Sequence, residues 1–275
     1  MTFNQLYLTL RKEYSLELSD ISDLFEHFFH KGLGNIYSVE EVGENGNKII
    51  DIVKSGYPIC YLTHKIKFCQ IDLFVDERVL IPRPETEELM YLILENERKY
   101  QSKDKVIYDV CTGSGAIAIA LTNLLNTNKV IASDISSKEA LEVAKRNNDI
   151  NGLNITFIES DYFKEFEKNN LEKADILVSN PPYIPSKTKL DDSLSFEPQQ
   201  ALFGGEDGLD FFKAFKAESA LNLLKKDARI YIEVCPEIIN EAISILEEEI
   251  PNYQFKKVKD MSNKERFIFG SINNK

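Results

Sequence analysis

The chain has 275 residues, of which 43% are hydrophobic and 28% charged, as in a soluble globular protein with one large domain or two unequal ones. Its net charge of −12 argues against a protein that grips duplex nucleic acid, because such proteins usually present a basic face. The four cysteines form no CxxC pair and no histidine cluster accompanies them, so we expect reduced thiols and no metal site.

The first 60 residues are predicted to form a small helical domain. Apolar residues at positions 3, 6, 7 and 10 have the spacing of a helix. A second helix is expected in "SDISDLFEHFFHKGLG", capped by Ser19 or Asp20, and a third around residues 47–56. The opening residues lack the apolar core of a signal peptide, and the longest uncharged run is interrupted by "TGSG", so no membrane span is expected. We therefore expect a cytoplasmic protein.

Residues 61–82 are predicted to form a β-hairpin linker, because "IKFCQIDLFV" is rich in β-branched and aromatic residues. A helix should follow in "RPETEELMYLILENE". Pro84 suits the first helical position, and three glutamates in the opening turn suit the positive end of the helix dipole.

Residues 83–275 are predicted to form an α/β domain in which strands and helices alternate. Strands are expected at 106–110, 129–133, 155–159, 175–179 and 228–234. Helices are expected near 115–125, 137–151, 162–169, 208–225 and 237–248. This alternation predicts a doubly wound, Rossmann-like parallel sheet. The chain should end in an antiparallel hairpin formed by residues 253–260 and 265–272.

A glycine-containing turn in "DVCTGSGAIAIAL" (109–121) separates the first of these strands from its helix. Gly113 and Gly115 would let a ligand approach the backbone at the carboxyl edge of the sheet, although glycine can also serve turn geometry alone. The dinucleotide fingerprint G-x-G-x-x-G is incomplete, since Ala118 stands at its third glycine position. No P-loop lysine follows, so a triphosphate ligand is not expected.

Acidic residues follow the next two strands. Asp134, 19 residues after Gly115, could accept hydrogen bonds from two ribose hydroxyls, or cap a helix that starts near Ser137. Asp161 and Tyr162 could bind an adenine amine and stack on its ring, or serve as an N-cap and a core aromatic. Because these residues follow strands at the same sheet edge, together they predict an adenosine-containing cofactor.

The fourth strand leads into "SNPPYIPS" (179–186), which places Asn180 directly after a buried run. An amide or exocyclic amine nitrogen is a poor nucleophile because its lone pair is delocalised. The Asn180 side-chain oxygen and a neighbouring carbonyl could accept its two N–H bonds, with Pro181 and Pro182 fixing that backbone. Tyr183 could pack on a planar target group. A rigid turn would explain the two prolines, but not asparagine first and an aromatic residue fourth.

The motifs "TGSGAIAIAL", "SDIS", "SDYF" and "NPPYIP", in this order, resemble a class I S-adenosylmethionine-dependent methyltransferase of the NPPY group. Three further stretches, "VLIPRPETEEL" (79–89), "VSNPPYIP" (178–185) and "FEPQQALFGGEDGLDFF" (196–212), are similar to the HemK/PrmC family. That family consists of protein-(glutamine-N5) methyltransferases acting on peptide chain release factors. The resemblance covers roughly residues 57–270, and "RPETE" ahead of the cofactor motif makes it specific.

The resemblance implies methyl transfer from S-adenosyl-L-methionine to the glutamine amide of a release factor's Gly-Gly-Gln motif, with S-adenosyl-L-homocysteine as the product. It implies a donor site formed by Cys111, Thr112, Gly113, Ser114, Gly115, Asp134, Asp161, Tyr162 and Asn180. It implies a glutamine site, with Asn180 as the catalytic residue, formed by Asn180, Pro181, Pro182, Tyr183, Arg83 and Glu85. Thr86 would line the same wall, although this segment could serve only to start a helix. Residues 1–60 would dock the protein substrate.

Three residues depart from the family's pattern. Cys111 and His64 stand where many members have glycine, and Phe196 replaces a more usual tyrosine, which removes a hydroxyl group. The small Cys111 side chain should be tolerated. The sequence does not indicate what His64 changes.

Two other functions are open from the sequence. NPPY also suits a nucleic-acid amine methyltransferase acting on adenine N6 or guanine N2, since those targets present the same planar NH2 group. Against it, residues 186–207 carry two lysines and five acidic residues. A non-catalytic protein built on the donor-binding fold is disfavoured by the intact Asn180, Asp134 and both glycines. We expect release factors as partners, no direct nucleic-acid or membrane contact, and a monomer.

Overall fold

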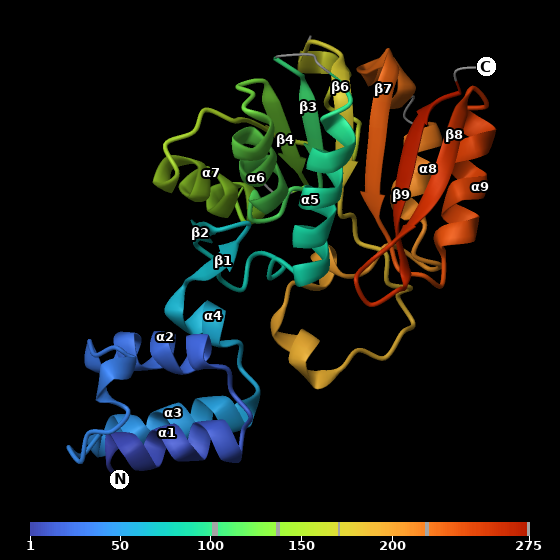
Figure 1. The fold of residues 1–275 in the computed structure, drawn as a ribbon. Helices are drawn as coiled ribbons and strands as arrows, with labels where there is room; N and C mark the ends of the chain where they lie inside the picture. Colours follow the sequence, from blue (N-terminus) through green and yellow to red (C-terminus); the bar gives the residue numbers. More distant parts are fainter. Residues whose placement is uncertain (101–103, 136–137, 170, 218–219, 274–275) are drawn as a thin grey trace. The chain divides into compact units, whose positions relative to one another are not determined.

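The computed structural model describes residues 1–100, 104–135, 138–169, 171–217 and 220–273 (Figure 1). These residues form two compact units. The first comprises Met1–Lys65 and the segment Leu190–Phe196, and the second comprises Ile66–Lys189 and Glu197–Lys275. None of the helices in these ranges is long and apolar enough to cross a membrane.

The first unit is helical and confirms the three predicted helices. It contains α1 (Phe3–Lys12), α2 (Leu18–Phe29), the short 3-10 helix η1 (Leu33–Asn35), α3 (Gly43–Ser55) and the unpredicted α4 (Ile59–Thr63). α1 starts with a capping box, in which Thr2 and Gln5 each accept a hydrogen bond from the other's backbone. Apolar side chains at helical spacing form one core, from Phe3, Leu6, Leu10, Ile21, Leu24, Phe25 and Ile49.

The predicted cap of α2 is wrong. Glu17 is the N-cap and makes no side-chain cap bond, while Ser19 and Asp20 already lie in the first turn. The helix forms without such a bond because its apolar face, which includes Ile21 and Leu24, is buried against its neighbours.

The hairpin predicted after this unit is confirmed as β1 (Ile66–Phe68) and β2 (Ile71–Leu73). Its turn consists of Cys69 and Gln70, which both have positive φ, of 48° and 64°. The hairpin belongs to the second unit, where its apolar side chains join the core beside α5 (Pro84–Glu97).

A seven-stranded sheet in the order β5-β4-β3-β6-β7-β9-β8 forms the centre of the second unit. Its parallel strands are β3 (Ile107–Val110), β4 (Val130–Asp134), β5 (Thr156–Glu159), β6 (Ala174–Ser179) and β7 (Leu224–Glu233). The chain builds outward from β3 to β5 and then returns to β6 on the other side of β3. Open α/β sheets bind ligands at such a reversal, outside the carboxyl ends of the strands.

The remaining strands, β8 (Tyr253–Lys259) and β9 (Glu265–Ile272), form the predicted antiparallel hairpin, and β9 pairs with β7. Helices cover both faces of the sheet (Figure 1). On one face lie α5 and α6 (Ala116–Leu125), and on the other lie α8 (Asp210–Ala217) and α9 (Ile239–Glu249). Successive residues of β6 alternate between the two cores, which explains its nearly continuous apolar sequence. The predicted doubly wound α/β fold is confirmed.

Two predicted helices differ in the structure. In place of a helix at 162–169 there is only the 3-10 helix η2 (Glu167–Asn169), because Tyr162 has a left-handed φ of 49° and Phe163 is anchored in the core. The helix predicted at 208–225 is shorter, since the chain is already in β7 at Leu224. Three further short 3-10 helices are present. η3 (Asp192–Phe196) belongs to the first unit, and η4 (Gln199–Ala201) and η5 (Ala220–Leu223) belong to the second.

Candidate active site

The ends of β3, β4, β5 and β6 surround a cavity of about 360 Å³ within the second unit. The start of α5 and part of segment 198–203 also line it. The predicted site residues in its lining are Arg83, Cys111, Thr112, Gly113, Ser114, Asp134, Asp161, Tyr162, Asn180 and Pro182, together with Thr86. The predicted residues outside the lining are Glu85, Gly115, Pro181 and Tyr183.

The loop after β3 is a tight turn with three left-handed residues. Cys111, Gly113 and Gly115 have positive φ, of 64°, 53° and 82°. A Cβ on Gly113 would meet no atom within 4 Å, whereas one on Gly115 would lie 3.3 Å from Ala144 of α7 (Ala140–Ile150). Gly113 therefore leaves open space beside the cavity, and Gly115 lets the loop pack closely on α7.

Asp109, at the end of β3, is fully buried beneath this loop. Its Oδ2 accepts hydrogen bonds from the Thr112 hydroxyl at 2.6 Å and the Ala118 amide at 3.1 Å. Burial raises the pKa of this carboxyl to about 7, and its Oδ1 has no hydrogen-bond partner among the described residues. Asp109 is not part of the cavity lining, and its two hydrogen bonds hold the loop and the start of α6 from beneath.

Asp134 ends β4 and lies beside the same loop. Its Oδ2 accepts a hydrogen bond from the Gly113 amide at 2.8 Å, and its Oδ1 accepts one from the Ile135 amide at 2.9 Å. A carboxylate can accept about four hydrogen bonds in all, so a side chain of this kind can also bind hydroxyl donors of a ligand. The N-cap of α7 is Glu139, so Asp134 does not cap that helix, and Ser137 lies outside the described residues.

Asp161 and Tyr162 follow β5 at the adjacent wall of the cavity. The Asp161 carboxylate forms an ion pair with Lys164, which partly neutralises its negative charge. The Tyr162 ring meets the edge of Phe211, with ring centroids 5.8 Å apart. This contact fixes an aromatic ring in the cavity wall.

Asn180 follows β6 directly, and its side chain reaches α5. Its Nδ2 donates a hydrogen bond to Thr86 Oγ1 at 3.1 Å, and the Thr86 hydroxyl donates to Glu233 Oε2 at 2.8 Å. The Asn180 oxygen Oδ1 accepts no hydrogen bond from the part of the chain that the structure describes. The cavity thus contains an amide oxygen that is available to a donor on a ligand.

Arg83 is held at the cavity wall by an ion pair with Glu197, a buried side chain. The other oxygen of Glu197 accepts a hydrogen bond from the Ile81 amide at 3.0 Å. Together these bonds fix the segment that leads into α5.

The glycine-rich segment 203–208 packs on the backbone of the NPPY motif. A Cβ on Gly204 would lie 2.3 Å from the carbonyl oxygen of Pro182, and one on Gly208 would lie 2.3 Å from that of Tyr183. The Tyr183 ring packs against the core that contains α8 and α9, and burial raises the pKa of its hydroxyl. The backbone of the NPPY motif is therefore held by the glycine-rich segment, and its tyrosine ring is held by the core.

Four residues of this region were not found from the sequence. Asp109 had a signal, because it is the acidic residue of an apolar strand. Glu197 and Glu233 lie 114 and 147 residues from the side chains they bind, so no local pattern marks them. Asn147 of α7 is fully buried, and its Nδ2 donates to the Ser114 carbonyl oxygen at 2.9 Å, which supports the β3 loop from behind.

Known proteins resemble this chain over most of its length. The family model "Methyltransferase small domain" matches residues 88–195. The release factor glutamine methyltransferase of Bacillus cereus is 36% identical over 85% of this chain and 83% of its own. That of Leptospira interrogans is 34% identical over 94% of this chain and 90% of its own.

A solved methyltransferase structure from Pyrococcus furiosus covers 74% of this chain and 88% of its own, with a TM-score of 0.52. Its sequence identity is 16%, so it supports the class I methyltransferase fold alone. The sequence relatives are similar enough, and cover enough of both chains, to assign the family. This chain belongs to the family of release factor glutamine methyltransferases.

Proposed function

We propose that this protein transfers a methyl group from S-adenosyl-L-methionine to the N5 amide nitrogen of glutamine in the Gly-Gly-Gln motif of peptide chain release factors. Family membership supports the reaction, and the names of the relatives indicate the substrate. The observation that carries the proposal is the orientation of Asn180. Its amide nitrogen is bound to Thr86, so its oxygen is available in the cavity.

The donor site fits S-adenosyl-L-methionine by the chemistry of its lining. Cys111 to Gly115 would hold the methionine part, Asp134 would accept the ribose hydroxyls, and Asp161 and Tyr162 would contact the adenine. The bound donor supplies an electrophilic methyl group on a sulfonium, which leaves as the neutral thioether S-adenosyl-L-homocysteine. The protein therefore needs no acid for the leaving group.

Asn180 would act on the substrate amide through hydrogen bonds. Its Oδ1 would accept one N–H bond and a backbone carbonyl of the motif would accept the other, with Pro181 and Pro182 fixing that backbone. Both bonds turn the nitrogen lone pair toward the methyl group and stabilise the positive charge that grows on nitrogen. Arg83 would position the peptide from the cavity wall. Glu85 and Tyr183 lie outside the cavity lining, so they would support the glutamine site from behind it. The extra proton would pass to solvent.

The charges of the segment after the NPPY motif favour a peptide over a nucleic acid. Lys187 pairs with Glu206 and Lys213 pairs with Asp207, each at 2.7 Å. Binding phosphates would have to compete with these acidic partners. A Gly-Gly-Gln loop needs no phosphate contacts, and its glycines bring no side chains to clash with a narrow site.

Residues 1–60 would dock the protein substrate and residues 83–275 would carry out the transfer. Residues 61–82 would join these parts, and their hairpin packs in the core of the second unit. Tyr37 and Val39 of the first unit are 79% and 86% exposed, and such apolar surface suits a protein partner. Replacing both by serine should raise the KM for a release factor and leave affinity for the donor unchanged. An unchanged KM would remove these two residues from the docking surface.

Labelled S-adenosyl-L-methionine, offered in parallel with a purified release factor, duplex DNA, tRNA and rRNA, tests the reaction. We expect label only in the release factor, at glutamine. Asn180→Ala should keep most of the donor affinity and lose about two orders of magnitude in rate, or about 3 kcal/mol, because one aligned acceptor is gone. Label in a nucleic acid at an equal rate, or Asn180→Ala turnover within about threefold of wild type, would contradict the proposal.

A further inference from the structure

Three side chains from three elements form a hydrogen-bonded series behind the proposed methyl-acceptor site. Asn180 follows β6, Thr86 lies in the first turn of α5, and Glu233 ends β7. The Asn180 Nδ2 to Thr86 Oγ1 distance is 3.1 Å, and the Thr86 Oγ1 to Glu233 Oε2 distance is 2.8 Å. Thr86 is 4% exposed and Glu233 is 1% exposed, so water competes little for these bonds.

The carboxylate of Glu233 sets the direction in which hydrogen bonds are donated along this series. An ionised Glu233 can only accept, so the Thr86 hydroxyl must donate its single hydrogen to it. The Thr86 oxygen then offers only lone pairs to Asn180, which selects the NH2 group of the asparagine as the donor. The Asn180 oxygen is left facing away from Thr86.

An asparagine side chain can also turn by 180°, since its NH2 group and oxygen are similar in size. Turned in this way, Asn180 would present N–H groups to the N–H groups of a substrate amide, and no hydrogen bond could form. The correct orientation therefore needs a neighbour that accepts from NH2 and cannot donate to oxygen. A threonine bound to a carboxylate meets this condition.

We propose, on the basis of the function proposed above, that Thr86 and Glu233 are positioning residues that hold the Asn180 amide with its oxygen toward the substrate. Neither side chain needs to touch the substrate to act in this way. Thr86 sets the orientation of Asn180, and Glu233 sets the orientation of the Thr86 hydroxyl.

The surroundings of Glu233 make this series sensitive to pH. Burial raises the pKa of Glu233 to about 7. The hydrogen bond from Thr86 and the positive charge of Arg266 on β9 lower this pKa, but by less than burial raises it. At the start of α5, the charge of Glu85 raises the pKa of Glu233 and the charge of Arg83 lowers it. The Tyr183 hydroxyl, after β6, also interacts electrostatically with this carboxyl. A protonated Glu233 could donate to Thr86, whose hydrogen could then turn to the Asn180 oxygen and stabilise the wrong orientation.

The test compares Thr86→Val with Thr86→Ser in steady-state methylation of a release factor. Thr86→Val keeps the shape but removes the hydroxyl, and kcat should fall roughly tenfold with the donor Kd and the release factor KM unchanged. Thr86→Ser should restore most of the rate. In an Asn180→Ala background, Thr86→Val should have no further effect on kcat. Equal rates for the valine and serine variants, or additive losses with Asn180→Ala, would overturn the proposal.

Glu233→Gln separates positioning from a purely structural role. A glutamine can accept from Thr86 or donate to it, so kcat should fall less than in Thr86→Val, and the rise of wild-type kcat through about pH 7 should disappear. If Glu233→Gln keeps the wild-type pH profile, Glu233 does not act through this series.

A nuclear magnetic resonance readout makes the inference independent of the substrate. The Asn180 side-chain NH2 signals, assigned by their loss in Asn180→Ala, should shift in Thr86→Val and titrate with Glu233 in the wild-type protein. Unchanged signals would refute the positioning role, even if Thr86→Val folds poorly, because the titration uses the wild type. Wild-type protein that methylates no release factor while these signals behave as expected would refute the proposed function alone.

Discussion

Two residues that depart from the family's glycines occupy backbone conformations that glycine adopts most easily. Cys111 has a φ of 64° in the β3 loop, and His64 has a φ of 54° as the left-handed C-cap of α4. Both positions therefore favour glycine for the same reason, which is the steric cost of a Cβ in the left-handed region. The third departure, Phe196, places its ring edge on Tyr57 with centroids 5.4 Å apart, a contact that needs no hydroxyl.

His64 offers a direct measure of this backbone cost. His64→Gly should be more stable to denaturant than His64→Ala by roughly 1 kcal/mol, because both variants lose the side chain and only alanine keeps the Cβ. The same pair at Lys65, which does not have a positive φ, should rank in the opposite order. Equal stabilities of the two His64 variants would show that the position carries no such cost.

At the scale of elements, periodicity and turn residues predict most of this fold. The alternating apolar runs indicated all five parallel strands and the final hairpin, and Pro84 marked the start of α5. The α-helix expected at 162–169 did not form because Tyr162 adopts a left-handed φ and Phe163 is anchored in the core. Local spacing does not reveal a left-handed tyrosine.

The candidate site also contains residues that the sequence could predict and residues that it could not. Residues at the ends of strands were predictable, because parallel strands bring their carboxyl ends to one edge of the sheet. Their supporting side chains were not, since Glu197 and Glu233 meet their partners only after the chain has folded. The sequence therefore indicated which residues could touch ligands, and the structure shows what holds them.

The segment 203–208 supports the NPPY motif, and Gly208 is its point of closest approach to Tyr183. Gly208→Ala should cost roughly 2 kcal/mol of stability and lower kcat, because its φ is +81° and its Cβ would lie 2.3 Å from a carbonyl oxygen. Gly152 has a φ of +63° and open space around it, so Gly152→Ala measures the cost of the left-handed backbone alone, without a steric clash. If chemical denaturation shows equal losses for both variants, the contact with Tyr183 does not matter.

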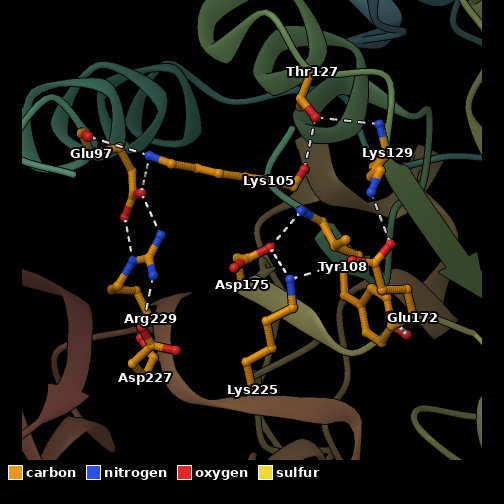
Figure 2. A network of polar contacts seen from close by, with 11 residues as sticks. Glu97, Lys105, Tyr108, Thr127, Lys129, Glu172, Asp175, Lys225, Asp227 and Arg229 are labelled. Carbon is orange, nitrogen blue, oxygen red and sulfur yellow. Dashed lines mark hydrogen bonds and ion pairs between the residues drawn. The ribbon is translucent and has the colours of Figure 1, made fainter. Parts of the chain in front are cut away.

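At the scale of the second unit, α5 is tied to β7 at both of its ends. Near the cavity, Thr86 binds Glu233, and at the opposite edge of the sheet Glu97 binds Arg229 (Figure 2). The Glu97 carboxylate also accepts hydrogen bonds from Lys105 at 2.7 Å and from the Tyr231 hydroxyl at 2.5 Å. These bonds fix the position of α5 along the direction of β7. They therefore also fix where Thr86, at the other end of α5, lies relative to Asn180.

The ionisation of Glu97 follows from these partners. Burial alone would raise the pKa of Glu97, but the hydrogen bonds from Arg229, Lys105 and Tyr231 outweigh it and hold that pKa below its usual value. A carboxylate with a lowered folded pKa stabilises the protein fully above its unfolded pKa, and this contribution is lost as the pH falls through the folded pKa.

Glu97→Gln should therefore lower the free energy of unfolding by about 3–5 kcal/mol at neutral pH, because it leaves two buried cations without a counterion. The difference from wild type should stay constant down to about pH 5 and shrink in stronger acid. Glu172, which pairs with Lys129 and Lys225 at the same edge but is exposed, is the matched control, and Glu172→Gln should change the unfolding midpoint little (Figure 2). Equal effects of the two variants, or a Glu97 difference that does not change in acid, would show that the buried ion pairs do not hold α5 in place.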